Sequence, residues 1–353
     1  MPETIELQGN MNETVDRNTP LLAVCIPTHN RRTVLEECLA SILPQAEALG
    51  VGVCVADNGS SDSTWQFLEA LKKQYPRMQI IHHTRDIGYR DNLTSAILSS
   101  RAQYVWPIGD KMVLLPGMLE YVVAVLLRLH PSAVVVNISG RVVSNAEKVY
   151  SVPQGCLTEL GWHVTLLGAT VMPQQAWIDM LRVRTPSRDF PQVVALFSYL
   201  ASLSASHVLF SGRILAEAAK SANESHVMSY WANRSLETWG RNWYDAVMSL
   251  PVLYSTDDKL QTIRSHSEHT GVLGLKSLMR LRVQGELTLQ RLNADKVPLR
   301  VAISAPWWSA VIISVVPRWL LRPALYVHPR LVLRTMRSRL RFSRGHQAHQ
   351  ITP

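Results

Sequence analysis

Apolar and polar positions alternate in blocks along the first third of the chain. Continuous apolar runs at 21–27 and 51–57 end at Pro27 and Asp57, a pattern typical of strands buried on both faces. Between them, residues 31–43 place their apolar side chains at helical spacing. The same alternation then predicts a helix at 60–74, a strand at 78–83, a helix at 90–100 and a strand at 104–106. This order predicts an α/β fold with a parallel, doubly wound sheet.

The rest of the chain is less regular. Strands are predicted at 131–137 and 166–172, a hairpin at 140–153, and helices at 174–181, 193–203, 227–247 and 273–292. Residues 301–316 carry no charge, and this run is slightly too short to cross a bilayer unaided. We therefore expect the sheet to be followed by a helical C-terminal region.

Composition and charge narrow the choice of partner. With 353 residues, 47% of them hydrophobic, the chain can bury one large core or two modest ones. The net charge is +9, but eight arginines and no acid lie between Arg318 and the C-terminus, so the remainder is nearly neutral. This distribution disfavours a broad nucleic-acid surface and favours one local anionic partner.

The C-terminal arginines also lie close to Trp307, Trp308 and Trp319. Trp and Arg together suit the interface of an anionic bilayer, so we expect this region to associate with the membrane. The alternative is a hydrophobic helical hairpin packed on the rest of the protein, followed by a solvated basic tail.

The cysteines and the N-terminus indicate the compartment. The four cysteines show no CxxC spacing, and two of them fall inside predicted strands, which favours buried thiols in a reducing compartment. Residues 1–20 are polar and acidic and lack the pattern of a signal peptide. We expect a flexible leader and a cytoplasmic protein.

Polar side chains follow three of the predicted strands. Thr28, Asn30 and Arg31 follow the first strand, Asp57 ends the second, and the sequence Gly109-Asp110-Lys111 follows the fourth. Neither GxGxxG nor GxxxxGK[ST] occurs after the first strand, so a dinucleotide fingerprint and a P-loop are both excluded there. Ligands of open α/β sheets bind at the carboxyl ends of strands, which makes these loops the candidate site.

Four sequence blocks in the first 120 residues resemble the family 2 glycosyltransferases with a GT-A fold. They are IPTHNR, ADNGSSDST, RDIGYRDN and YVWPIGDKMVLLPG, in the order and at the spacing typical of that family. The Trp before Gly-Asp is similar to members that build bacterial surface polysaccharides, such as abequosyltransferase-like enzymes. The resemblance implies a Rossmann-like nucleotide-sugar-binding domain over 21–255. Its nucleotide-sugar half would be 21–120 and its acceptor half 121–255, with the helical, basic, membrane-associating region at 256–353.

The resemblance also implies a reaction. The enzyme would move a sugar, with inversion, from a nucleoside-diphosphate sugar to a saccharide acceptor, and we expect that acceptor to be lipid-linked at the inner face of the cytoplasmic membrane. The donor-binding residues it implies are Pro27, Thr28, Asn30, Arg31, Asp57, Arg85, Arg90, Asn92, Arg264 and His266. A turn-forming role for Asp57 and a solvated role for Arg85 and Arg90 remain alternatives.

The metal loop departs from the family pattern. Asp110 is followed by Lys111 instead of a second acid, and Mg²⁺ or Mn²⁺ is normally held by hard oxygen ligands from two carboxylates. Three possibilities stay open. In the first, Lys111 itself neutralises the leaving diphosphate. In the second, Asp110 holds a divalent cation with help from His266 or His269 in a loop at 262–274, where Arg264 would bind a phosphate. In the third, the centre is not catalytic.

The general base is chosen from three residues. The family places an acid after the acceptor-side helix, and Asp189 is our choice, with Asp179 and His163 as alternatives. Asp189 could instead be the N-cap of the helix at 193–203. A different class of function, a non-catalytic nucleotide-sugar-binding or scaffold protein at the membrane, is the alternative to an enzyme. A nucleotidyltransferase is a weaker third reading, because its glycine-rich phosphate loop is missing.

Overall fold

The computed structural model of the chain describes residues 19–144, 146–182, 189–221 and 234–326. Nearly all of the predicted leader lies outside these residues, as does the first part of the predicted helix at 227–247. The chain divides into two compact units. The first comprises Met1–Val227 and Ser249–Ser255, and the second comprises Met228–Met248 and Thr256–Pro353.

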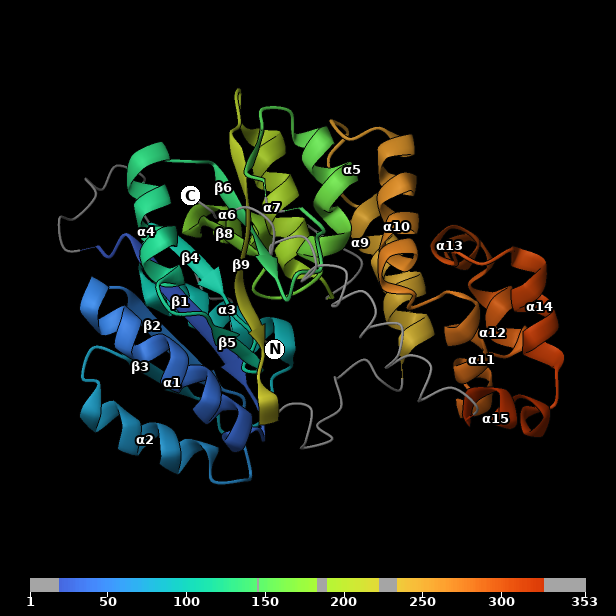
Figure 1. Cartoon of the computed structure of the whole chain (residues 1–353), viewed down its shortest axis with the longest axis horizontal. Coiled ribbons are helices and arrows are strands. Elements are labelled where there is room, and N and C mark those ends of the chain that lie inside the picture. The colour runs from blue at the N-terminus through green and yellow to red at the C-terminus, as the bar shows by residue number, and fades with distance from the viewer. Residues whose placement is uncertain (1–18, 145, 183–188, 222–233, 327–353) are drawn as a thin grey trace, which may run out of the picture. The chain divides into compact units, whose positions relative to one another are not determined.

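A mixed sheet runs through the first unit (Figure 1). Its strands are β1 (Leu22–Thr28), β2 (Gly52–Asp57), β3 (Gln79–His82), β4 (Tyr104–Pro107), β5 (Met112–Leu114), β6 (Ala133–Ile138), β7 (Lys148–Tyr150), β8 (Thr170–Pro173) and β9 (Val208–Ala218). Within the described residues the order is β3-β2-β1-β4-β8-β6-β9-β5, and β7 pairs with β9. The first four strands are parallel, as predicted. Strand β8 is antiparallel to both neighbours, so the sheet as a whole is mixed.

Helices cover both faces of the parallel part. Those of the first unit are α1 (Arg32–Leu49), α2 (Thr64–Gln74), α3 (Tyr89–Ser100), α4 (Met118–Leu129), α5 (Pro153–Val164), α6 (Gln174–Arg182) and α7 (Pro191–Ser202). Leu22 and Val24 of β1 pack in one buried cluster with apolar side chains of α1 and α4. Cys25 points the other way, and its thiol reaches the backbone oxygen of Ala96 in α3. This alternation is what a strand buried on both faces requires.

The acceptor half differs from the prediction in three places. The hairpin predicted at 140–153 is wrong, because β7 pairs with β9 and not with a neighbour inside that segment. Helix α5 and strand β9 were not predicted. The sequence Ser211-Gly212-Arg213 interrupts the apolar pattern of β9, and the pairing of β9 with β6 shifts register there. All four cysteines are buried, as expected.

The second unit is helical in its described part. It contains η1 (Glu237–Asn242), α9 (Trp243–Met248), α10 (Thr256–Thr270), α11 (Leu275–Gln284), α12 (Leu289–Ala294), α13 (Lys296–Ala302), α14 (Trp307–Val315) and α15 (Arg318–Tyr326). Among the described residues, no single helix is long and apolar enough to cross a membrane. Helices α13 and α14 together have the necessary length and composition, but they are bent by 117°.

Candidate active site

Three loops meet at the carboxyl ends of β1, β2 and β4. Thr28, the last residue of β1, is paired in register with Asp57, the last residue of β2. The loop after β4 begins beside β1, because the backbone nitrogen of Ile108 donates to the oxygen of Cys25 over 2.9 Å. The Thr28 hydroxyl then donates to Oδ2 of Asp110 over 3.1 Å. The structure therefore brings together the polar loops that the sequence marked as the candidate site.

An ion pair lies at the centre of this edge. Nη1 of Arg31 is 3.0 Å from Oδ1 of Asp110, whose side chain is only 5% exposed. Burial raises the pKa of the Asp110 carboxyl, and the Arg31 guanidinium opposes that rise. Burial, followed by the nearby Arg31 charge, lowers the pKa of the adjacent Lys111 ammonium. Two cations and one buried carboxylate thus stand side by side, and the excess positive charge suits an anionic ligand.

This set of residues does not fit a divalent cation. One oxygen of Asp110 accepts from Thr28 and the other from Arg31, so the only acid of the loop already has protein partners. Across the part of the chain that the structure describes, no group of three or more His, Cys, Asp or Glu residues could hold a metal ion. A divalent cation here would also face the positive charges of Arg31 and Lys111.

Asp57 is completely buried at the end of β2. Its Oδ1 accepts a hydrogen bond from the Ser60 hydroxyl, and its Oδ2 lies 3.1 Å from Nδ1 of His82. The His82 ring in turn lies 4.4 Å from the ring of Trp65. The carboxylate is therefore held in a fixed orientation. His82 was missed by the sequence analysis, although it is the residue of β3 that pairs in register with Asp57 and could have been found that way.

The loop after β1 is joined to the loop after β2 by Asn30. Its backbone has a φ of 52°, in the left-handed region that Asn tolerates. Its Oδ1 accepts from the backbone nitrogens of Ser61 over 2.7 Å and Asp62 over 3.3 Å. Asn30 therefore braces the two loops, and a contact with the donor remains a prediction.

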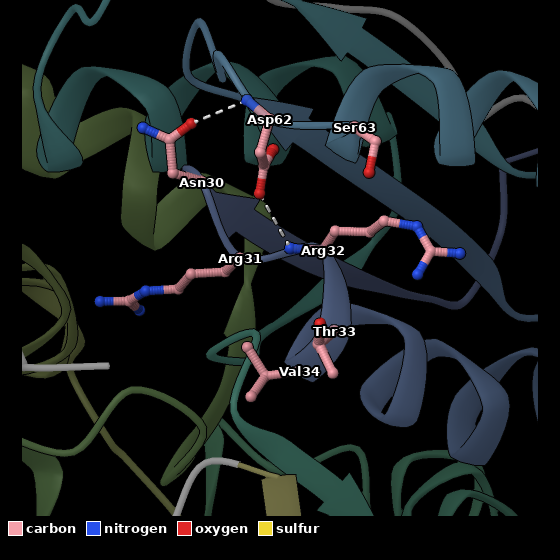
Figure 2. Close-up of a pocket in the computed structure, with 7 residues that line it drawn as sticks. All are labelled: Asn30, Arg31, Arg32, Thr33, Val34, Asp62 and Ser63. Carbon is pink, nitrogen blue, oxygen red and sulfur yellow. Dashed lines mark hydrogen bonds between the residues drawn. The ribbon is translucent and has the colours of Figure 1, made fainter. Parts of the chain in front are cut away.

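A cavity of about 320 Å³ opens between these two loops (Figure 2). Figure 2 shows the side chains of Arg31 and Arg32 pointing in opposite directions from the start of α1. Arg31 reaches Asp110, whereas Arg32 forms an exposed ion pair with Glu36 over 2.9 Å. The two neighbouring arginines are therefore not equivalent, and only Arg31 belongs to the ion pair of the candidate site.

The loop before α3 is anchored by Asn58. Its side chain donates to Asp86 over 2.5 Å and accepts from the backbone nitrogen of Ile87 over 2.9 Å. The turn needs glycine at 59, where φ is +68° and a Cβ would come within 2.6 Å of the Arg85 backbone. The Arg85 side chain is exposed.

The other two predicted donor ligands on α3 make contacts inside the protein. Nη2 of Arg90 lies 3.6 Å from the sulfur of Met180. Asn92 is buried, and its amide donates to the oxygen of Ala56 over 3.0 Å. Asn92 thus holds the end of β2 in place through this hydrogen bond. The roles of both residues toward a donor stay predictions.

The three candidates for the general base lie in different environments. Asp189 is half-buried immediately before α7, and the N-cap position falls on Phe190, so the N-cap alternative for Asp189 is wrong. Asp179 lies on α6, where it pairs with Arg182 over 3.4 Å. His163 is fully buried in α5.

His163 is a structural residue. Its Nε2 lies 2.9 Å from the oxygen of Val136, which requires the ring to donate from Nε2. Its Nδ1 has no hydrogen-bond partner within the described residues, so a second proton there would be unsatisfied. Burial accordingly lowers the pKa of His163 to about 4.

This buried histidine predicts a pH effect on stability. Because the folded pKa lies below the ordinary 6.5, the unfolded chain binds the extra proton first, and stability is lost as the pH falls below 6.5. Between neutral pH and pH 5 we expect His163 to account for a loss of about 2 kcal/mol in the free energy of unfolding. Urea titrations of wild type and His163→Gln at both pH values measure it. Equal losses in the two proteins would contradict the assignment.

The predicted loop at 262–274 is wrong, because residues 256–270 form helix α10. His266 is 2% exposed, and its ring stacks on Trp239 at a centroid distance of 4.2 Å. Nδ1 of His269 lies 2.8 Å from the oxygen of Ser265, and Arg264 pairs with Glu268 over 3.5 Å. The three residues belong to the second unit, and their proposed contact with the donor is a prediction.

Comparison with known proteins gives a consistent set of relatives. Residues 23–177 match the family model described as glycosyl transferase family 2. Abequosyltransferase RfbV of Salmonella typhimurium is 32% identical over 93 residues, which are 26% of this chain and 28% of that protein. The chain thus matches little more than a quarter of the length of this relative.

Two solved structures share the fold. TarS 1–349 of S. aureus, in complex with UDP-GlcNAc, is 15% identical with a TM-score of 0.55, over 80% of this chain and 83% of that one. Mannosyltransferase PcManGT from Pyrobaculum calidifontis, in complex with GDP-Man and Mn²⁺, is 13% identical with a TM-score of 0.50. That match covers 86% of this chain and 88% of PcManGT. At this identity the likeness shows the fold.

Proposed function

Residues 23–177 of this chain belong to glycosyl transferase family 2 with a GT-A fold, and from this we propose that the protein moves a sugar from a nucleoside-diphosphate sugar to a saccharide acceptor. The observation that carries the proposal is the edge where Thr28, Asp57 and the Arg31–Asp110 ion pair meet. It offers a fixed carboxylate for a base or ribose hydroxyl, together with excess positive charge for a diphosphate.

We propose that Arg31 and Lys111 take over the task of neutralising the diphosphate. A leaving nucleoside diphosphate gains negative charge in the transition state, and fixed cations aimed at that charge stabilise it. Arg31 is held by Asp110 at 3.0 Å, so the guanidinium is oriented before the donor arrives. Asp110 acts here as a positioning residue, and transfer proceeds without a divalent cation.

The transfer step we propose uses the residues of this edge and Asp189. The acceptor hydroxyl attacks the anomeric carbon from the face opposite the diphosphate, and a new carbon–oxygen bond forms as the bond to the diphosphate breaks. The electron pair of the broken bond stays on the diphosphate oxygen, beside Arg31 and Lys111. The hydroxyl proton passes to the Asp189 carboxylate, and the configuration at the anomeric carbon is inverted.

Two observations support a proposal for the acceptor and the place of action. We propose a lipid-linked saccharide acceptor in bacterial surface polysaccharide synthesis, reached from the inner face of the cytoplasmic membrane. The name of the relative RfbV, an abequosyltransferase, supports a saccharide product. The arginine-rich and acid-free C-terminal sequence supports an anionic membrane surface.

One observation favours a second function. The acid of the metal loop is engaged by Arg31 and Thr28, as it could be in a protein that binds nucleotide sugars at the membrane without turning them over. Slow hydrolysis of the donor by the purified protein separates the two functions. Nucleotide binding without hydrolysis or transfer would leave the scaffold function.

A thermal-shift screen tests the donor class. UDP, GDP and dTDP sugars are added separately to the full chain without added metal, and one nucleotide class is expected to raise the Tm. At a ligand concentration 100-fold above Kd, the stabilisation is about 2.7 kcal/mol. Asp57→Ala, which removes the fixed carboxylate, should lose the shift. The exposed control Glu36→Ala should keep it, and the absence of a shift with every nucleotide would contradict the proposal.

A further inference from the structure

Helices α14 and α15 carry apolar side chains that the second unit does not bury. Those exposed by half or more are Trp308 (66%), Ile312 (53%), Val315 (57%), Trp319 (67%) and Leu320 (51%). The opposite side of α14, with Ala310 and Ile313, is buried within the unit. We call the five exposed residues the α14/α15 apolar face.

This face differs from ordinary surface exposure. Single exposed apolar residues are common and need no explanation, whereas a gathering of large ones marks an interaction site. Five of them lie within residues 308–320, and among the described residues these include both of the exposed tryptophans. Their helices are anchored from behind, since Nε of Arg282 in α11 donates to the oxygen of Val316 over 2.9 Å.

The sequence of this region favours one kind of partner. From Lys296 to the C-terminus the sequence contains ten Lys or Arg residues and no Asp or Glu. Of these, Arg300 lies 6.0 Å from the ring centroid of Trp307, and Arg322 is exposed on α15. Exposed Trp and exposed Arg on one helix, as with Trp319 and Arg322 of α15, fit the boundary between acyl chains and anionic headgroups.

We propose that the α14/α15 apolar face docks on an anionic lipid bilayer. Trp308 and Trp319 enter the headgroup region, and Arg300 and Arg322 lie near the lipid phosphates. The unit lies on the membrane surface without spanning it. The proposal rests on the second unit alone, so it stands or falls independently of the sugar-transfer reaction.

Vesicle flotation of the full chain tests this docking. Phosphatidylcholine vesicles with and without phosphatidylglycerol are compared, and the wild type is expected to float with the anionic ones. The double variant Trp308→Ala/Trp319→Ala should lose about tenfold or more in vesicle affinity. Arg322→Gln should lose about fivefold, on anionic vesicles only, and salt should weaken wild-type binding.

The control is a double variant that also replaces two exposed apolar residues with alanine, but in the first unit. Val143→Ala/Val252→Ala changes two residues of the first unit that are 100% and 99% exposed, and it should bind as the wild type does. Circular dichroism confirms that all variants are folded, and hydrolysis of a soluble donor should be the same in all of them. No wild-type flotation, or equal flotation of the tryptophan variant, overturns the proposal. A second result would also overturn it: light scattering shows a dimer of the wild type, and the tryptophan variant loses the dimer but still binds vesicles. The face would then bind a second copy of the chain.

Discussion

Replacing Lys111 with alanine is expected to lower kcat by about 10²–10³-fold, the usual effect of removing one group that stabilises developing charge. The wild-type enzyme should keep its full turnover in EDTA. The reason is that both oxygens of Asp110 already have protein partners, and that Arg31 and Lys111 would supply the positive charge that we propose for the diphosphate. Steady-state kinetics with the donor identified by thermal shift measure both effects.

Arg32→Ala is the matched control for this experiment. Arg32 lies one residue from Arg31 but points the other way and pairs with exposed Glu36, so its loss should change kcat little (Figure 2). If EDTA abolishes wild-type turnover and Mn²⁺ restores it, the metal-free mechanism is wrong. Unchanged kcat in Lys111→Ala would likewise remove Lys111 from the reaction.

Asp189→Asn is expected to lower kcat by about 10²–10⁴-fold, the range typical of a lost general base. Asparagine keeps the size of the side chain but cannot take the hydroxyl proton, so the affinity for the donor should not change. Single-turnover kinetics measure the rate of transfer, and titration with the donor measures its affinity.

The neighbouring acid on α6 provides the control. Asp179→Asn removes a carboxylate that pairs with Arg182 and accepts from Gln175 over 2.7 Å on the helix surface. Its turnover should remain near the wild-type value. A severe loss in Asp179→Asn together with a mild one in Asp189→Asn would exchange the roles of the two residues.

Strands β1 and β2 were predictable because burial on both faces leaves a continuous apolar run that ends abruptly. The position of the candidate site follows from the same signal, since Thr28 and Asp57 are the first polar residues after such runs. The Arg31–Asp110 pair was not predictable in this way. Its members are 79 residues apart, and periodicity within a segment carries no information about which loop ends meet.

Helix α10 shows a different limit. Its buried side includes Thr262, Ser265 and His266, which a hydropathy pattern reads as solvated. His266 is buried because its ring stacks on Trp239, a contact made through an aromatic surface and not through an apolar chain. The polarity of these residues therefore predicted a loop, whereas their packing places them in a helix.

The loop at 108–111 depends on chain that is synthesised much later. On one side it is fixed to β1, and on the other the oxygen of Lys111 accepts from the backbone nitrogen of Ala219 over 2.7 Å, next to the pairing of β5 with β9. The family match ends at residue 177, before β9 begins. A nascent chain that has emerged only as far as the match would hold Asp110 through Thr28 and Arg31, but would lack the contact between Lys111 and Ala219. This contact of the candidate site therefore forms only after β9 has been synthesised, well after the residues of the loop have left the ribosome.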